Sequence, residues 1–207
     1  MAVVQDNRTV AKGPSRTWSV PNLLTYGRIL AVPAVVACFY LEAPLSHWAG
    51  CIVFTVASVT DFFDGYLARA WHQESRIGRM LDPIADKMLV GGSLFMLAGA
   101  QVVGGWSLLA GVIILGREFA VSGLREFLTG LQADGSVKVT WLAKCKTVVQ
   151  MTAIAVLLLS QVADQWFPWL VAGQGVASFI GLSLLWLSAI VTLITGYGYF
   201  REGLRHT

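Results

Sequence analysis

The sequence predicts an all-α integral membrane protein whose six transmembrane helices enclose a polar cavity that faces the cytoplasm. Three observations lead to this fold class: an apolar composition, six long apolar runs, and basic residues confined to alternate connections between those runs. Of the 207 residues, 56% are hydrophobic and only 13% are charged, whereas a soluble domain carries about 25% charged residues. We therefore expect a lipid bilayer to surround most of the chain.

Six stretches approach the length of about 20 mostly apolar residues that a helix needs to cross a bilayer. They cover residues 23–41, 48–70, 84–103, 106–128, 148–163 and 176–200. The first run opens after Pro21, a residue favoured at the start of a helix, and a charged link separates the second run from the third. The fourth carries charges inside its apolar run, the fifth is short but clearly apolar, and the sixth ends before Arg201.

All 15 basic residues can face one side of the membrane in this arrangement. They are Arg8, Lys12, Arg16, Arg28, Arg69, Arg76, Arg79, Lys87, Arg117, Arg125, Lys138, Lys144, Lys146, Arg201 and Arg205. The opposite connections hold only Glu42, His47, Asp164 and polar or aromatic residues. Because Lys and Arg near helix ends accumulate on the cytoplasmic side, we expect both termini in the cytoplasm and an even number of spans.

The chain divides into three parts. Residues 1–20 are mixed and polar and lack the contiguous apolar stretch of a cleaved signal peptide, so we expect a cytoplasmic lead-in. Residues 21–201 form the six-helix domain, and residues 202–207 form a cytoplasmic tail. The one-sided basic surface favours anionic lipids and phosphorylated ligands, although orientation alone accounts for the same charges. We expect no nucleic-acid partner.

Four carboxylates lie at or near the membrane boundary, where a lone buried charge is costly unless it is paired or bound to a metal. Asp61 and Asp64 are three residues apart, and Asp82 and Asp86 are four apart. On helices, each pair therefore projects from one face. Two such faces could meet. Because like charges repel, four acids held together make sense chiefly with cations between them, and carboxylate oxygens suit Mg²⁺, Mn²⁺ or Ca²⁺.

Small residues share the faces of these acids and leave room for a ligand; they are Gly65, Ala68 and Gly78. Arg69 lies at the edge of the same face. A structural alternative is that Asp82, which precedes Pro83, caps a helix, and that nearby arginines orient the chain and pair with acids. This alternative explains neither the interleaved small residues nor the acids embedded in apolar runs.

The whole pattern resembles the signature of the CDP-alcohol phosphatidyltransferase family at every position. It reads Asp61-Phe-Phe-Asp64-Gly65-Tyr-Leu-Ala68-Arg69, eight residues, Gly78, three residues, Asp82, three residues, Asp86. Eight fixed positions within 26 residues make the motif highly specific. The resemblance implies an enzyme with a six-helix transmembrane core that forms homodimers.

The resemblance also implies a role for each motif residue. Two divalent cations, Mg²⁺ with Mn²⁺ as a possible substitute, would be held by Asp61, Asp64, Asp82 and Asp86. The cytidine diphosphate pocket would be lined by Asp61, Asp64, Gly65, Ala68, Arg69 and Gly78. Asp86 would also act as general base when an alcohol attacks the phosphoryl group next to diacylglycerol in CDP-diacylglycerol and CMP leaves. Paired metals can clamp such a phosphoryl group, and a neighbouring carboxylate can deprotonate the alcohol.

The first apolar run opens with Pro21-Asn22-Leu-Leu-Thr25-Tyr-Gly-Arg28, which resembles the opening helix of the family. Asn22, Thr25 and Arg28 share one broad helical face. We favour binding of the nucleotide or its phosphates by these residues, with Arg28 the strongest candidate. The alternative is that they anchor the helix at the interface and start it.

Two further segments carry basic residues near the cytoplasmic side: Gly116-Arg117-Glu118, which continues to Arg125-Glu126, and Lys144-Cys-Lys146. The candidates for binding a phosphate on the acceptor alcohol are Arg117, Arg125, Lys144 and Lys146, since Arg binds phosphate bidentately and Lys supplies a point charge. For the two lysines, ordinary cytoplasmic flanking is an equally good explanation. Glu118 and Arg125 are seven residues apart on one helix face.

Together with Leu81-Asp82-Pro83-Ile-Ala-Asp86-Lys87, these segments look most like the phosphatidylglycerophosphate synthase branch of the family. That branch implies CDP-diacylglycerol and sn-glycerol 3-phosphate as substrates and a bacterial cytoplasmic membrane as location. The nearest alternative keeps the chemistry and changes the acceptor to inositol phosphate, serine or phosphatidylglycerol. An alternative from another class is a cation transporter, which would need acids across the membrane depth, whereas these four gather near one side.

Overall fold

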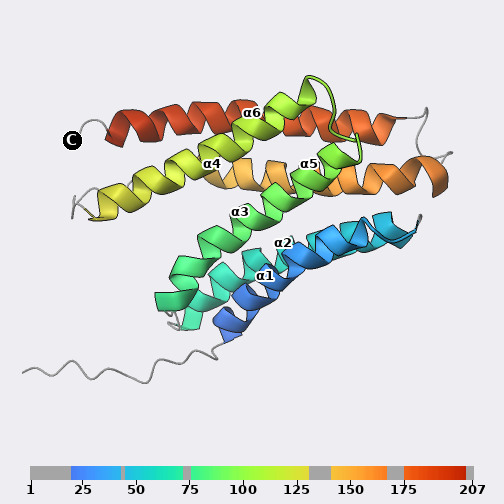
Figure 1. The fold of residues 1–207 in the computed structure, drawn as a ribbon. Coiled ribbons are helices and arrows are strands. Elements are labelled where there is room, and N and C mark those ends of the chain that lie inside the picture. Colours follow the sequence, from blue (N-terminus) through green and yellow to red (C-terminus); the bar gives the residue numbers. More distant parts are fainter. Residues whose placement is uncertain (1–19, 43–44, 72–75, 131–140, 167–174, 204–207) are drawn as a thin grey trace, which may run out of the picture.

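The computed structural model describes residues 20–42, 45–71, 76–130, 141–166 and 175–203. Every regular element in these ranges is an α-helix (Figure 1). The helices are α1 (Val20–Cys38), α2 (Leu45–Trp71), α3 (Arg76–Gly99), α4 (Ser107–Gly130), α5 (Trp141–Trp166) and α6 (Val176–Gly203). The predicted all-helical fold is confirmed. Residues 1–19 of the expected lead-in and residues 204–207 of the expected tail lie outside the described ranges.

Successive helices run in opposite directions, so their ends alternate between the two ends of the bundle (Figure 1). The start of α1, the end of α2, the start of α3, the end of α4, the start of α5 and the end of α6 all lie at the left of that view. Two groups build the bundle: α1 packs against α2 and α3, while α6 packs against α4 and α5. Contacts of α5 with α2 and α3, and of α3 with α4, join the groups.

Two helices begin well before the apolar runs that indicated them. α3 begins at Arg76 and α5 at Trp141, whereas the apolar runs begin at residues 84 and 148. Hydropathy reports contact with lipid, not helicity, so a polar first turn carries no apolar signal. Pro83 lies inside α3. The alternative that Asp82 caps the start of this helix is therefore wrong.

The centre of the bundle is filled by large apolar side chains from several helices. Phe54, Leu89, Ile114, Leu157 and Leu185 are each no more than 1% exposed. Gly181 lets α6 approach α5 closely, because a Cβ atom there would lie 2.7 Å from Cγ of Leu157. Small residues at such contacts allow membrane helices to pack backbone to backbone.

The outside of the bundle is apolar as well. Three helical segments are long and apolar enough to cross a membrane, namely Ser107–Leu124, Cys145–Ala163 and Val176–Gly198, and the described residues include two shorter apolar helices, Leu23–Cys38 and Leu45–Thr60. Large apolar side chains point outward from them and from α3: Phe95 is 78% exposed and Phe179 72%. Exposed apolar surface of this extent is typical of a protein that contacts membrane lipid or another protein.

Candidate active site

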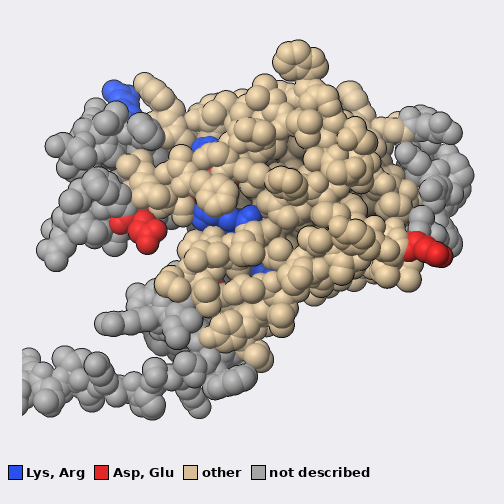
Figure 2. Space-filling view, in the orientation of Figure 1, with Lys and Arg blue, Asp and Glu red and all other residues tan. Residues whose placement is uncertain are grey.

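The described surface is hollowed at the end where α2 ends and α3 begins, and Lys and Arg atoms are visible inside the hollow (Figure 2). One side of this end is formed by α1, α2 and α3, and the other by α4 and α6, with α5 between them (Figure 1). The helices that carry the predicted acids thus face those that carry the predicted acceptor-binding residues. The basic residues whose side chains are described are Arg28, Lys87, Arg117, Lys146 and Arg201.

On the acidic side, α1 and α3 are joined through a predicted metal ligand. Thr25 of α1 is buried, and its Oγ1 donates a hydrogen bond of 2.6 Å to Oδ1 of Asp82 in α3. Asp82 is exposed and Asp86, one turn later, is half-buried. Because the bond engages one oxygen of an exposed carboxylate, Asp82 fits the role of an oxygen ligand that is oriented by a neighbouring hydroxyl.

The other predicted motif residues lie on the helices that meet here. Asp61, Asp64, Gly65, Ala68 and Arg69 fall in the last three turns of α2, and Gly78 falls in the first turn of α3. α2 and α3 contact each other, so the topology brings the two halves of the motif to one end. The structure does not describe the side chains of these six residues. Among the side chains it does describe, no group of three potential metal ligands occurs.

The proposed nucleotide residues of α1 differ in their surroundings. Arg28 is only 3% exposed and lines a groove of about 430 Å³ between α1 and α2, together with Thr60 at the start of the acidic motif. Thr25, expected to bind the nucleotide, faces Asp82. Asn22 lies in the first turn of α1, and its side chain is outside the described set.

On the basic side, Lys146 of α5 forms an ion pair with Glu118 of α4. The side chains are 5% and 18% exposed, respectively. α5 also contacts α3, which carries Asp82 and Asp86. Lys146 therefore lies on the helix that joins the acidic side to the basic side.

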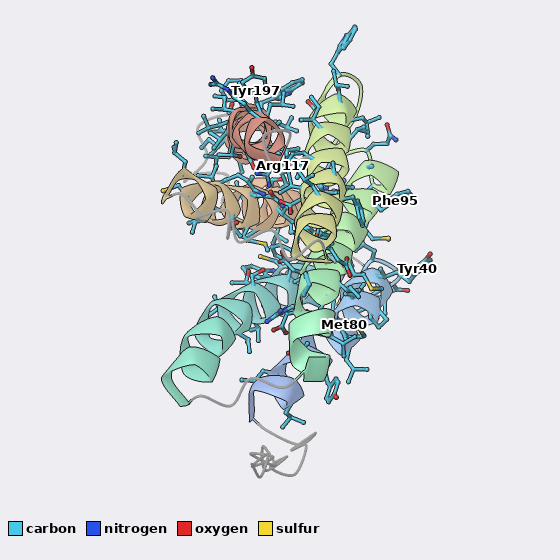
Figure 3. All side chains as sticks on the ribbon, turned by 90° about the vertical axis from the view of Figure 1, so that its left-hand side faces the viewer. Tyr40, Met80, Phe95, Arg117 and Tyr197 are labelled. Carbon is cyan, nitrogen blue, oxygen red and sulfur yellow. The ribbon has the colours of Figure 1, made fainter. Side chains whose placement is uncertain are left out.

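Arg117, the second basic residue of this side, extends from α4 toward α6. Its Nη2 atom donates a hydrogen bond of 3.0 Å to Oγ1 of Thr195, and Figure 3 shows the side chain between α4, α5 and α6. Two further predicted acceptor-binding residues, Arg125 on α4 and Lys144 on α5, lie on the same helices. Their side chains are outside the described set.

Sequence reasoning missed three residues of this site. Glu118 is a charge in an apolar run, and its spacing predicts a shared helix face with Arg125, which does not indicate the pairing with Lys146. Thr195 and Gly196 of α6 were not singled out at all. Thr and Gly are common in membrane helices, so their presence in the sequence does not indicate a functional role. Only the packing of α6 against α4 reveals them.

Comparison with known proteins identifies the family of the chain. The chain matches the sequence profile of the CDP-alcohol phosphatidyltransferase family over residues 18–195. It is 44% identical to the CDP-diacylglycerol--glycerol-3-phosphate 3-phosphatidyltransferase of Cereibacter sphaeroides, over 90% of this chain and 96% of that protein. It is 43% identical to the protein of the same name from Rickettsia bellii, over 88% and 94% of the two chains.

A third relative of that name, from Shigella flexneri serotype 5b, is 38% identical over 85% of this chain and 90% of its own. The matched region, residues 18–195, contains the whole acidic motif and both basic segments. It also spans α1 to α5 and most of α6. The chain belongs to the CDP-alcohol phosphatidyltransferase family.

Proposed function

We propose that this protein transfers the phosphatidyl group of CDP-diacylglycerol to sn-glycerol 3-phosphate and releases CMP. The product is phosphatidylglycerol phosphate, the precursor of phosphatidylglycerol. The observation that carries the proposal is that relatives named for this reaction align over 85–90% of the chain at 38–44% identity. The geometry supports it, because α3, which carries Asp82 and Asp86, contacts α5, which carries Lys146.

In this proposal the acidic side binds two divalent cations, Mg²⁺ or in its place Mn²⁺. The four ligands are Asp61, Asp64, Asp82 and Asp86. Carboxylate oxygens are the donors that such hard cations prefer, and the one-turn spacing of Asp82 and Asp86 on α3 presents two of them together. When bound, the cations neutralise charge that develops on the phosphoryl oxygens and on the leaving CMP.

Asp86 takes the proton of the attacking alcohol. The hydroxyl oxygen of the acceptor forms a bond to the phosphorus that carries diacylglycerol, the bond from that phosphorus to the CMP oxygen breaks, and the hydroxyl proton passes to the Asp86 carboxylate. Asp86 lies one turn after Asp82 on α3, which contacts α4 and α5, the helices that carry the proposed acceptor-binding residues. This position suits a group that must meet the acceptor.

The nucleotide is assigned to the ends of α1, α2 and α3. The proposed set is Asn22, Thr25, Arg28, Asp61, Asp64, Gly65, Ala68, Arg69 and Gly78. Arg28 supplies a buried positive charge beside Thr60. Thr25 contributes through Asp82, because its hydroxyl hydrogen bonds to that carboxylate.

The phosphate of the acceptor is assigned to Arg117, Arg125, Lys144 and Lys146. Arg117 of α4 and Lys146 of α5 lie on helices that both pack against α6. Lys146 is paired with Glu118. A set of four basic residues suits a phosphorylated acceptor better than plain serine.

We further propose that all six helices cross a bacterial cytoplasmic membrane, with both termini and the active-site cavity on the cytoplasmic side. The one-sided distribution of basic residues supports this orientation. Residues 21–201 then form the catalytic domain. The family resemblance supports a homodimer.

The first experiment measures CMP release by the detergent-purified protein with CDP-diacylglycerol, Mg²⁺ and one acceptor at a time. The acceptors are glycerol 3-phosphate, inositol phosphate, serine and phosphatidylglycerol, with an acceptor-free control for hydrolysis. Release only with glycerol 3-phosphate, lost in Asp86→Asn, supports the proposal. Release with another acceptor keeps the family and overturns the substrate. If the folded protein releases no CMP with any of them, a cation transporter becomes the better hypothesis.

A further inference from the structure

The side chain of Arg117 is held by two consecutive residues of α6. Its Nη2 atom bonds to Oγ1 of Thr195 at 3.0 Å, and Thr195 is 8% exposed. The hydroxyl of Thr195 is itself 2.8 Å from the carbonyl oxygen of Val191, one turn earlier in α6. Because the hydroxyl has a single proton to donate, donation to its own helix backbone leaves an oxygen lone pair aimed at Arg117.

Gly196 receives the aliphatic stem of the same arginine. A Cβ atom at Gly196 would lie 3.0 Å from Cγ and 3.3 Å from Nε of Arg117. The arginine stem therefore lies against the backbone of α6, and a methyl group at this position would push it away by a few tenths of an ångström. Thr195 and Gly196 form what we call the α6 seat: Gly196 accommodates the stem and Thr195 binds the guanidinium.

The α6 seat holds one of the two basic residues of this side. Arg117 is half-buried and bound by α6, whereas Lys146 is paired with Glu118 of α4. Arg117 and Lys146 come from α4 and α5, and both of these helices pack against α6. An anion that reaches both side chains would meet two cations whose positions the protein fixes.

We propose that Thr195 and Gly196 are positioning residues that fix the Arg117 guanidinium where it meets the phosphate of the acceptor. The α6 seat thereby sets the preference for a phosphorylated acceptor. Arg binds phosphate through a rigid planar fork, so its contribution depends on orientation, and a displaced guanidinium loses the second hydrogen bond. This inference rests on the proposed function, since that function supplies the acceptor phosphate.

The test compares four variants of α6. Gly196→Ala displaces the arginine stem, and Gly198→Ala is its matched control, because a Cβ atom at Gly198 meets nothing within 4 Å. Thr195→Val removes the hydroxyl at nearly constant volume, and Thr195→Ser keeps it. For each, KM and kcat are measured for glycerol 3-phosphate and KM for CDP-diacylglycerol, with the thermal unfolding midpoint in detergent as a check on folding.

We expect Gly196→Ala and Thr195→Val to raise KM for glycerol 3-phosphate about tenfold, the loss typical of one charge-assisted hydrogen bond. KM for CDP-diacylglycerol should stay unchanged, and Thr195→Ser and Gly198→Ala should behave like the wild type. An unchanged KM for glycerol 3-phosphate, or an equal rise for both substrates, overturns the α6 seat. If Gly196→Ala fails to fold, Thr195→Val and Thr195→Ser still decide.

Wild-type activity is measured first, because it separates the two hypotheses. Absence of CMP release with glycerol 3-phosphate overturns the proposed function, and the seat proposal with it. Normal wild-type activity combined with unaffected variants overturns the seat proposal alone.

Discussion

The hydroxyl of Thr25 and the carboxylate of Asp82 are 2.6 Å apart, although they lie on different helices and 57 residues apart in the chain. Thr25 is buried in α1, and Asp82 is exposed on α3. The bond fixes the direction of a carboxylate that we propose as a metal ligand. It also gives the buried hydroxyl of Thr25 a hydrogen-bond partner on a neighbouring helix, as buried polar groups require.

Replacing Thr25 by Val should therefore raise the Mg²⁺ concentration required for half-maximal CMP release, by about 10- to 100-fold, as for other residues that orient metal ligands. Thr25→Ser keeps the hydroxyl and should stay close to the wild type. Both are titrated with Mg²⁺ at saturating CDP-diacylglycerol. An unchanged Mg²⁺ requirement in Thr25→Val, together with a weaker affinity for CMP, would show that Thr25 binds the nucleotide instead.

Removal of divalent cations should abolish activity. The proposed ligands include Asp82 and Asp86, whose carboxylates repel one another across one helical turn without a cation, and loss of the cations should slow CMP release at least about 100-fold. The measurement treats the protein with EDTA and then restores Mg²⁺, Mn²⁺ or Ca²⁺ one at a time. Full activity in EDTA would contradict the metal-dependent mechanism.

Gly181 should be intolerant of even a methyl group. A Cβ atom there would lie 2.7 Å from Cγ and 3.3 Å from the backbone nitrogen of Leu157, and Leu157 is fully buried. Gly181→Ala should thus separate α5 from α6 and destabilise the protein by about 1–3 kcal/mol. At Gly111 the nearest atom, Cδ1 of Leu94, would be 4.0 Å away, so Gly111→Ala is the control.

The unfolding midpoint of each glycine variant is followed by tryptophan fluorescence in detergent. Gly181→Ala should unfold at lower temperature than the wild type, and Gly111→Ala should not. Equal midpoints for the two variants would mean that the contact between α5 and α6 is looser than the structure indicates.

The acidic side of the site could be predicted from the sequence, and the basic side only in part. The motif from Asp61 to Asp86 occupies the end of α2 and the start of α3. The spacing of its residues is therefore enough to predict which of them share a helix face. Arg117 and Thr195 are 78 residues apart. Nothing in the apolar run of α6 distinguishes Thr195 from Thr192, and only the packing of α4 against α6 selects one of them.

The positions of the helix ends could not be predicted from the sequence either. Apolar runs predict where a helix touches lipid, but α3 begins eight residues before its apolar run, which starts at Ile84. Those residues include Asp82, and their helical conformation places it one turn from Asp86. Hydropathy alone does not place Asp82 inside a helix, and it therefore also allows Asp82 to be interpreted as a helix cap.

The ion pair between Lys146 and Glu118 should contribute more to binding of the acceptor than to the net stability of the fold. Its side chains are only 5% and 18% exposed, and removal of one partner of a buried pair leaves an uncompensated charge, which costs about 3–5 kcal/mol. Lys146→Met and Glu118→Leu should each lower the unfolding midpoint. The double variant removes both charges together, so its stability should return toward that of the wild type.

Activity should follow a different pattern, and this separates the two roles. The double variant keeps the fold but lacks the Lys146 ammonium that we assign to the acceptor phosphate, so KM for glycerol 3-phosphate should stay high even where stability recovers. KM for CDP-diacylglycerol serves as the internal control, since the nucleotide is assigned to α1, α2 and α3. A double variant with recovered stability and a normal KM for glycerol 3-phosphate would mean that Lys146 is a structural residue, because its charge would then be dispensable for binding the acceptor.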